Sequence, residues 1–205
     1  NANEENEGSA PADPVLVMQV MGRKIGFIPA AARLADPGRR MPMQIYMPES
    51  GLNMEQLAEN VNAELKRSGR CMVILSEGFD VGDIGVRRDA FGHAEFGASD
   101  MTAQQVVVSY LNTHKLSARG AARGQVSGTD QRSNILNASE VDLDEAYAVG
   151  RKAAEVARSA GNGWMATILR EPGPAYRVRY DKVPLQDVAN SERTFPQHWL
   201  TPDKI

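Results

Sequence analysis

The sequence predicts an α/β fold with three layers, in which a mostly parallel sheet carries helices on both faces. Apolar runs that begin at Val15 and Cys71 have the length of strands buried on both faces. Segments with apolar residues at helical spacing alternate with these runs along the chain. Such alternation is typical of parallel strands joined by helices that cover both faces of the sheet.

The first part of the chain supports this prediction element by element. The run from Val15 breaks at Gly22-Arg23, and we expect a helix to begin near Phe27, with Pro29 in its first turn. A strand that turns over a glycine into a helix is half of a β-α-β unit, and ligands of such sheets bind at the carboxyl ends of the strands. A short alternating strand is expected next, over residues 43–47.

A long amphipathic helix and the second buried strand follow. Asn53 and Gln56 form the pattern of a capping box, and Gly69 ends the helix that they begin. The strand that starts at Cys71 completes this part of the sheet. Residues 79–99 are polar and rich in glycine, so we expect them to leave the sheet as an excursion that contains a hairpin.

The remaining residues predict two further helices and three extended segments. Asp100 is expected to cap a helix that runs to about Thr113, and a capping pair at Asp142 and Glu145 is expected to begin another, which Gly161 ends. The extended segments are residues 120–132, 165–169 and 176–180, with a loop over 133–141 and a short helix and tail from Pro184.

Composition excludes several classes of protein. The 205 residues are 42% hydrophobic and 24% charged, which is ordinary for a globular protein. The net charge is −3, but residues 1–14 carry four acids and no base, so the rest of the chain stands at +1 and gives no support for a nucleic-acid partner. No apolar run approaches the roughly 20 residues that span a bilayer. The single cysteine excludes an intramolecular disulfide and fits a cytoplasmic protein.

Residues 1–14 are polar and acidic, and we expect them to form a disordered leader or a cloning remnant. One folded domain is expected over residues 15–205. The first strand begins directly after the leader, with no folded element before it. We therefore expect the chain to be a piece of a longer protein.

Charged residues stand at or near the ends of the expected strands. Arg23 and Glu77 each follow an apolar strand, and Arg123 and Arg132 lie in the extended segment between residues 120 and 132. Arginine matches phosphate oxygens in pairs, and a carboxylate accepts hydrogen bonds from sugar hydroxyls, so the set suits a phosphorylated polyol. From the residues alone, a solvated basic edge and a surface acid are the simpler interpretation. The histidines show no metal-ligand spacing, and we assign no metal ligand.

Several motifs together resemble the phosphofructokinase family, in family order across residues 15–200. They are Met21-Gly22-Arg23-x-x-Gly26-Phe27, Val73-Ile-Leu-Ser76-Glu77-Gly78, Asp89-x-Phe91-Gly92-His93, Arg123-Gly-Gln-Val-Ser-Gly128-Thr129-Asp130-Gln131-Arg132-Ser133 and Val188-Ala189-Asn190. The third and fifth are similar to blocks of the pyrophosphate-dependent branch. Each motif alone is weak, but the set is specific. It implies one Rossmann-like half of a phosphofructokinase, namely the C-terminal half that binds the sugar phosphate.

The resemblance implies roles for the residues that follow the first two strands. Met21, Gly22 and Glu77 would hold the hydroxyls and the ring of fructose 6-phosphate. Arg23 would be the catalytic residue, because it would lie near the transferred phosphoryl group and stabilise the charge that develops there.

The resemblance also implies a binding site for the 6-phosphate of the sugar. Arg132 would bind that phosphate, and Arg123 would reach the 6-phosphate in the site of a neighbouring subunit, which requires a homo-oligomer. Thr129 stands where many members have histidine or tyrosine. Its hydroxyl can donate to phosphate, but it is short and uncharged, so we expect weaker retention of the 6-phosphate.

Two parts of the family's catalytic machinery are not found in this sequence: the glycine-rich phosphoryl-donor loop with its Gly-Gly-Asp pattern, and the segment that carries the general-base aspartate. We therefore expect the chain alone to bind fructose 6-phosphate without catalysis. The whole enzyme would transfer a phosphoryl group in glycolysis, with pyrophosphate as donor and with Mg²⁺ held mainly by the other half.

Three alternatives stay open. The enzyme could be an ATP-dependent phosphofructokinase, the chain could be a non-catalytic sugar-phosphate-binding or regulatory module, or it could be a structural oligomerisation domain. A fragment should also expose apolar surface that its other half normally covers, and we expect self-association from it.

Overall fold

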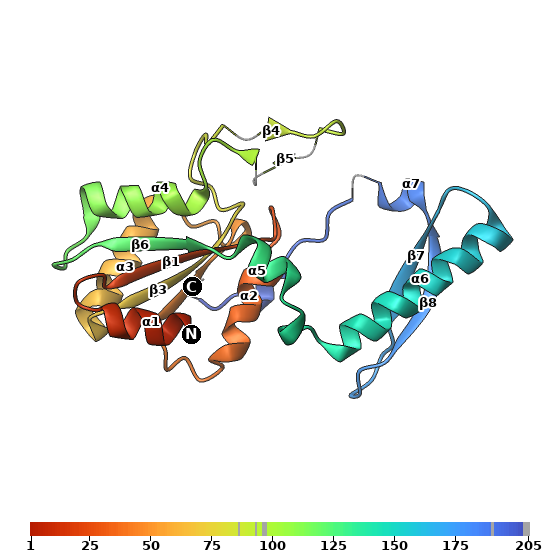
Figure 1. The fold of residues 1–205 in the computed structure, drawn as a ribbon, viewed down its shortest axis with the longest axis horizontal. Helices are drawn as coiled ribbons and strands as arrows, with labels where there is room; N and C mark the ends of the chain where they lie inside the picture. Colours follow the sequence, from red (N-terminus) through yellow and green to blue (C-terminus); the bar gives the residue numbers. More distant parts are fainter. Residues whose placement is uncertain (86, 93, 96–97, 190, 203–205) are drawn as a thin grey trace. The chain divides into compact units, whose positions relative to one another are not determined.

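The computed structural model describes residues 1–85, 87–92, 94–95, 98–189 and 191–202 (Figure 1). The chain forms two compact units. The first unit comprises residues 1–132 together with 194–205, and the second unit comprises residues 133–193. This differs from the single domain expected over residues 15–205, because the second unit builds a small sheet of its own instead of extending the main one.

A four-stranded parallel sheet organises the first unit (Figure 1). Its strands are β1 (Val15–Val20), β2 (Met43–Tyr46), β3 (Cys71–Ser76) and β6 (Ala122–Val126), in the order β2-β3-β1-β6. Strand β1 pairs in register with both neighbours, so that Val15 lies opposite Cys71 on one side and opposite Ala122 on the other. The predicted α/β class is confirmed, and β3, β1 and β6 end side by side at one edge.

Helices cover both faces of this sheet. The α3 (Met54–Ser68) and α4 (Ala103–Tyr110) helices pack on one face, where alternate strand residues such as Val17 and Val73 are completely buried. The short α2 helix (Phe27–Ala31) and the 3₁₀ turn over Ala32–Ala35 lie on the other face, against Met72 and Ile74. Strands buried on both faces explain the continuous apolar runs in the sequence.

The helix starts show which capping predictions were correct. Gln56 donates its backbone N–H to the Asn53 side chain at 2.9 Å and accepts from the Asn53 N–H at 3.0 Å, so the predicted capping box of α3 is confirmed. The prediction for α4 was wrong, because Thr102 and Gln105, not Asp100, form its capping box. A π-helical turn over Leu111–Lys115 continues that helix.

The segment 120–132 is only partly extended. Strand β6 ends at Val126, and α5 (Gly128–Ser133) follows it as a short helix that the sequence did not predict. Gly128 adopts a φ of 42°, which glycine reaches at little cost and which lets the chain turn directly from the strand into the helix. The helix places its residues at the carboxyl edge of the sheet.

The amino terminus also differs from its expected disorder. Residues Ala2–Ser9 form the α1 helix. The buried Asn6 side chain donates to the Pro14 carbonyl at 3.1 Å and accepts from the Arg70 guanidinium at 3.1 Å, while Glu5 forms an ion pair with Arg123 at 2.8 Å. These tertiary contacts order a segment whose composition alone predicts disorder.

The excursion over residues 79–99 contains the predicted hairpin. Strands β4 (Arg87–Arg88) and β5 (Ala94–Glu95) pair antiparallel and form a separate two-stranded sheet. Two residues of the motifs lie outside the described residues. They are His93, of the motif similar to the pyrophosphate-dependent branch, and Asn190, of the Val-Ala-Asn motif.

The second unit consists of one long helix and a hairpin. Helix α6 (Glu140–Ala160) is capped by Ser139, not by the predicted pair at Asp142 and Glu145, since the Asp142 N–H donates to the Ser139 hydroxyl at 3.3 Å. Strands β7 (Trp164–Arg170) and β8 (Val178–Pro184) pair antiparallel, as their short connection requires, and α7 (Leu185–Val188) follows. No helix in the described part of the chain is long and apolar enough to cross a bilayer.

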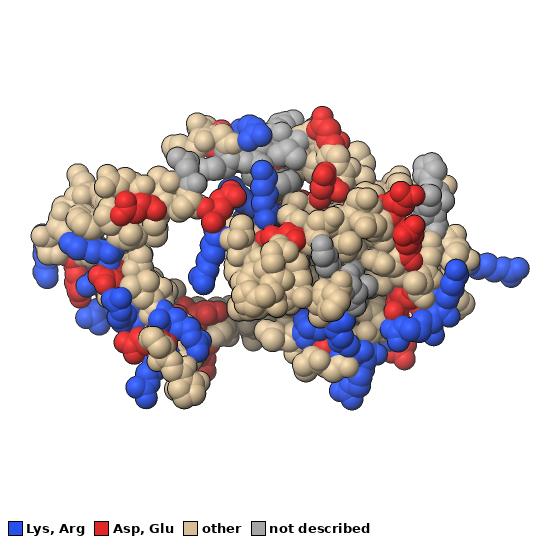
Figure 2. Space-filling view, turned by 180° about the vertical axis from the view of Figure 1, so that it is seen from behind, with Lys and Arg blue, Asp and Glu red and all other residues tan. Residues whose placement is uncertain are grey.

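Acidic and basic side chains are interleaved on the surface that Figure 2 shows. This distribution agrees with the small net charge of −3.

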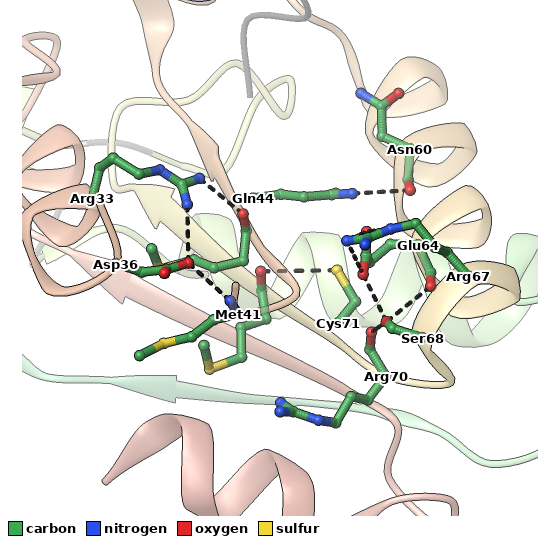
Figure 3. Close-up of polar contacts among 12 residues, drawn as sticks. Arg33, Asp36, Met41, Gln44, Asn60, Glu64, Arg67, Ser68, Arg70 and Cys71 are labelled. Atoms are coloured by element: carbon green, nitrogen blue, oxygen red, sulfur yellow. Dashed lines mark hydrogen bonds and ion pairs between the residues drawn. The ribbon is translucent and has the colours of Figure 1, made fainter. Parts of the chain in front are cut away.

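A buried carboxylate closes the turn between α2 and β2. Asp36, which is 3% exposed, accepts the backbone N–H of Arg40 and of Met41, each at 2.9 Å, and Arg33 lies 3.6 Å away as an ion-pair partner (Figure 3). These backbone donors, foremost Arg40, hold the pKa of Asp36 below its ordinary value of 3.8.

The lowered pKa makes this turn sensitive to acid. A carboxyl whose pKa is lower in the folded state than in the unfolded state stabilises the fold while it is ionised. For Asp36 this contribution is complete above the unfolded pKa of about 3.8. It is lost as the pH falls below that value and through the folded pKa. We expect Asp36→Asn to be less stable than the parent at pH 6 and to approach it as the pH falls below 3.8. Urea unfolding at several pH values measures this, with exposed Glu59→Gln as the control. A constant difference between Asp36→Asn and the parent across this range would contradict the assignment.

Candidate functional site

The candidate site is built on the turn that follows β1. Gly22 has a φ of 138° and Arg23 a φ of 48°, so the chain reverses in a backbone conformation that residues other than glycine rarely adopt. The Ile25 N–H donates to the Gly22 carbonyl at 2.9 Å and closes the turn. Arg23 is exposed at the carboxyl end of the sheet, where ligands of parallel sheets bind.

Glu77 holds this turn from the next strand. Its Oε1 atom accepts the backbone N–H of Gly22 at 3.2 Å and of Arg23 at 2.8 Å. The Glu77 N–H donates to the Val20 carbonyl at 3.0 Å and extends the β1–β3 pairing by one residue. The Glu77 carboxylate, which was expected to bind sugar hydroxyls, thus accepts hydrogen bonds from the backbone through Oε1. Its Oε2 atom can serve as a further acceptor.

The residues on either side of Glu77 also contact Arg23. The Ser76 hydroxyl donates to the Arg23 carbonyl at 3.2 Å. A Cβ atom added at Gly78 would lie 1.8 Å from that same carbonyl oxygen. Only glycine at position 78 therefore allows the two backbone segments to approach so closely.

The third contribution comes from α5, after β6. The Gln131 Oε1 accepts the Met21 N–H at 3.0 Å, and an Arg132 Nη atom lies 3.7 Å from the Met21 sulfur. Arg132 is exposed, as is Thr129 in the same helix. Residues from three neighbouring strand ends therefore meet around residues 21–23.

Arg123 lies apart from this group. It occupies the second position of β6, opposite Leu16, whereas Met21 follows β1 five residues later, roughly 16 Å farther along the strand direction. Its guanidinium pairs with Glu5 at 2.8 Å and donates to the Ser9 hydroxyl at 3.2 Å, while its Nε atom is buried without a partner. The structure thus brings Met21, Gly22, Arg23, Glu77 and Arg132 together and leaves Arg123 elsewhere.

The grouped residues present two exposed guanidinium groups and a carboxylate at one sheet edge. Guanidinium groups bind phosphate oxygens with paired, charge-assisted hydrogen bonds, and a carboxylate oxygen accepts from hydroxyl groups. The arrangement can therefore bind a small molecule that carries both hydroxyls and phosphate.

A polar recess elsewhere in the first unit is less suited to such a ligand. It measures about 250 Å³ and is lined by Arg33, Arg39, Met41, Met43, Gln44, Glu64 and Arg67. Glu64 holds Arg67 through both carboxylate oxygens, and Asp36 pairs with Arg33 (Figure 3). Arginines that already face carboxylates attract an anion less strongly.

Two further features of the described residues concern metal binding and thiol chemistry. In residues 1–202, apart from 86, 93, 96–97 and 190, no group of three or more His, Cys, Asp and Glu side chains is gathered for a metal ion. The Cys71 thiol is completely buried, and burial raises its pKa well above its ordinary value, so it is a core residue and not a nucleophile.

Comparison with known proteins decides the family. The family model described as phosphofructokinase matches residues 4–157, which include the whole of the group around Met21 and Glu77. The chain belongs to the phosphofructokinase family. The resemblance drawn from the motifs is confirmed at this level.

Relatives of the chain include pyrophosphate-dependent phosphofructokinases. The pyrophosphate–fructose 6-phosphate 1-phosphotransferase of Halomonas elongata is 33% identical over 201 residues, which cover 95% of this chain and 46% of that protein. The crystal structure of a pyrophosphate-dependent phosphofructokinase from Nitrosospira multiformis matches with a TM-score of 0.77 at 31% identity, over 99% of this chain and 47% of that one. A second such structure, from Marinobacter aquaeolei, matches with a TM-score of 0.70 at 28% identity.

The chain spans about half the length of the curated relatives that it matches. One more distant relative has a different name: the sulfofructose kinase of Alkalicoccus urumqiensis is 26% identical over 189 residues. The α/β fold is shared with the phosphofructokinase structures.

Sequence reasoning missed two side chains that bind the turn at residues 21–26. Gln131 was part of a quoted motif but was given no role, although it binds the Met21 N–H. Glu49 lies in the 3₁₀ turn Pro48–Ser50 that follows β2, and its Oε1 accepts the Gly26 N–H at 3.0 Å, beside the same turn. A carboxylate in the turn after a strand was the signal that was available for Glu49.

Gly78 tests whether the close approach to Arg23 holds the turn. We expect Gly78→Ala to lower the free energy of unfolding by about 2 kcal/mol, because the added Cβ must displace the Arg23 carbonyl. Urea unfolding measures the change. Gly38→Ala is the matched control in the same unit, since its Cβ would come no closer than 3.8 Å to a neighbour. Equal stability of the two variants would show that residues 23 and 78 are not packed as described.

Proposed function

We propose that this chain is the sugar-phosphate-binding half of a 6-phosphofructokinase, and that the whole enzyme converts fructose 6-phosphate to fructose 1,6-bisphosphate in glycolysis. The observation that carries the proposal is the meeting of Arg23, Glu77 and Arg132 at the ends of three adjacent strands. The names of four relatives, which are pyrophosphate–fructose 6-phosphate 1-phosphotransferases, support the substrate and the donor.

Each residue of the group has a proposed role. Met21, Gly22 and Glu77 bind the hydroxyls and ring of the sugar, and Glu77 does so with the oxygen that its backbone contacts leave over. Arg23 stabilises the negative charge that develops on the transferred phosphoryl group, as fixed cations do in phosphoryl transfer. The 22–23 turn holds the Arg23 backbone at the strand end.

The 6-phosphate of the sugar binds to Arg132 and Thr129, which share the α5 helix. Arg123 acts on the 6-phosphate of a neighbouring subunit in a homo-oligomer. Its position about five residues down the sheet from Met21 fits a role outside this chain's own site.

The phosphoryl donor binds mainly to residues outside this chain. The Gly-Gly-Asp pattern of the family's donor loop is not in the sequence, and so the chain alone binds substrate but does not turn it over. In this proposal Mg²⁺ enters with the donor and is held mainly by residues outside this chain. Pyrophosphate is the proposed donor, and ATP is the alternative.

Thr129 favours a second candidate substrate, a fructose that carries a sulfo group. A sulfonate bears one negative charge, whereas a phosphate at neutral pH bears nearly two. The short, uncharged Thr129 side chain, in the same helix as Arg132, suits the single charge of a sulfonate better than a histidine would. The name of the sulfofructose kinase relative supports this candidate.

Binding of fructose 6-phosphate to the 205-residue chain tests the proposal. We expect the melting temperature to rise with ligand concentration, by the amount that corresponds to about 2.7 kcal/mol at a hundredfold excess over Kd. Glu77→Gln and Arg132→Ala should each abolish most of this rise. Arg158→Ala, an exposed arginine in the second unit, should leave it unchanged.

The same titration separates the alternatives. A larger shift with sulfofructose than with fructose 6-phosphate would replace the first substrate by the second. A shift that survives in both site variants would place the sugar elsewhere. No shift with either ligand, in a chain that is folded by circular dichroism, would reject binding by this half and favour a structural domain.

Exposed apolar side chains in the second unit support an oligomer. Many large apolar residues of this unit are 37% to 92% exposed: Ile135, Leu136, Val141, Leu143, Tyr147, Trp164, Met165, Ile168, Tyr176 and Leu185. Large apolar surfaces on a folded unit mark sites of interaction, so this number of exposed apolar groups favours a covering partner. We infer that this surface is covered in the whole enzyme.

This surface predicts association of the isolated chain. We expect the sedimentation coefficient to rise with protein concentration, and Tyr147→Asp to reduce the rise because it places a charge among the exposed apolar groups. Ser159→Asp puts the same charge near the end of the same helix and serves as the control. A concentration-independent monomer in sedimentation velocity would contradict the inference.

A further inference from the structure

We propose that Glu49 and Gln131 are positioning residues for Arg23. Their side chains fasten the two ends of the Met21–Gly26 loop by hydrogen bonds. Gln131 lies in the segment by which the chain leaves the first unit, and Glu49 binds the segment by which the chain returns to it. The inference rests on the proposed function for the importance of Arg23. The fastening itself is a property of the fold and can be measured without a ligand.

The first fastening lies where the chain leaves the first unit. The second unit begins at Ser133, and Gln131 stands two residues before it. The Gln131 side chain accepts the Met21 N–H at 3.0 Å, across 110 positions of sequence. Arg132, next in the chain, contacts the Met21 side chain. The start of the loop is thus tied to the departing segment.

The second fastening lies where the chain returns. The second unit ends at Arg193, and the Phe195 N–H donates to Glu49 Oε1 at 3.1 Å. The same oxygen accepts the Gly26 N–H at 3.0 Å. The Gln197 side chain adds a bond to the Glu49 carbonyl at 3.0 Å. One carboxylate oxygen therefore joins the end of the loop to the returning segment.

Packing holds the carboxylate in this place. Glu49 Oε2 is buried and has no hydrogen-bond partner, so the hydrogen bonds of this carboxylate are those that Oε1 accepts from Gly26 and Phe195. A Cβ at Gly26 would lie 2.9 Å from Oε2 and 2.3 Å from the Met47 sulfur, which shows how closely the loop approaches. Phe195 is 7% exposed and packs edge-on against Phe27, with ring centres 5.2 Å apart.

The loop needs such external support. Its own backbone closes only the Gly22–Ile25 turn, and Arg23 sits at a positive φ that is unfavourable for a side chain. Glu77 fixes the middle of the loop, while Gln131 and Glu49 fix its two ends. A shift of either connecting segment must therefore strain the loop that carries Arg23.

Hydrogen exchange of the ligand-free 205-residue chain tests the two fastenings. We expect Glu49→Ala to increase the exchange rate of the Gly26 and Phe195 amides at least tenfold, and Gln131→Ala to do the same for Met21. The amides of β1 and β3 should keep their rates in both variants. Glu49→Gln should restore most of the protection, because its amide oxygen accepts the same two bonds. Glu59→Ala, an exposed acid of α3, is the matched control.

Two results would overturn the proposal. Faster exchange throughout β1 and β3 in Glu49→Ala would show a general loss of stability instead of a local fastening. Unchanged rates at Gly26 and Phe195 would show that Glu49 does not join these segments.

A second arm asks whether the fastening matters for the site. Fructose 6-phosphate should bind about tenfold more weakly to Glu49→Ala than to the parent, with Glu49→Gln close to the parent. Equal affinities would remove the functional part of the proposal. If the parent itself does not bind the sugar, the proposed function fails, and the exchange rates still decide whether the loop is fastened.

Discussion

The site depends on one hydrogen-bonded contact, in which the Glu77 carboxylate oxygen accepts the backbone N–H groups of Gly22 and Arg23. Arg23 at a φ of 48° costs roughly 1–2 kcal/mol relative to an ordinary conformation. Each hydrogen bond to a charged acceptor contributes about 1.5–3 kcal/mol, so the carboxylate outweighs this cost. Without it, the turn would relax and the guanidinium would leave the end of the strand.

Strand order makes this contact geometrically available. Because β3 and β6 both pair with β1 in parallel, the three strands end at the same edge of the sheet. The last paired residues of the two neighbours lie opposite Val20 and Gln19 of β1, which are one residue apart. The Glu77 and Ser127 N–H groups continue the pairing to carbonyls of β1. The buried core on both faces fixes the register, and the register fixes which residues meet beyond the last strand pair.

Patterns that repeat within a few residues were predictable from the sequence, whereas contacts between distant segments were not. The apolar runs gave the buried strands, and Asn53 with Gln56 gave the start of α3, because these signals act locally. The position of Arg23 and Glu77 at strand ends followed from the same runs. Gln131 and Glu49 were missed as site residues, since a side chain that binds backbone 110 or 146 residues away leaves no periodic trace.

The ion pair between Arg123 and Glu5 bears on the proposed oligomer. If Arg123 binds the phosphate in the site of a neighbouring subunit, its guanidinium must release the Glu5 carboxylate and bind that phosphate instead. Both side chains of the pair are about one-third exposed or more, and such pairs contribute at most about 1 kcal/mol in water. A phosphate brings nearly two charges and further acceptor oxygens, so it competes well against one carboxylate. The exchange is therefore inexpensive, and the acidic α1 helix is compatible with a phosphate-binding role for Arg123.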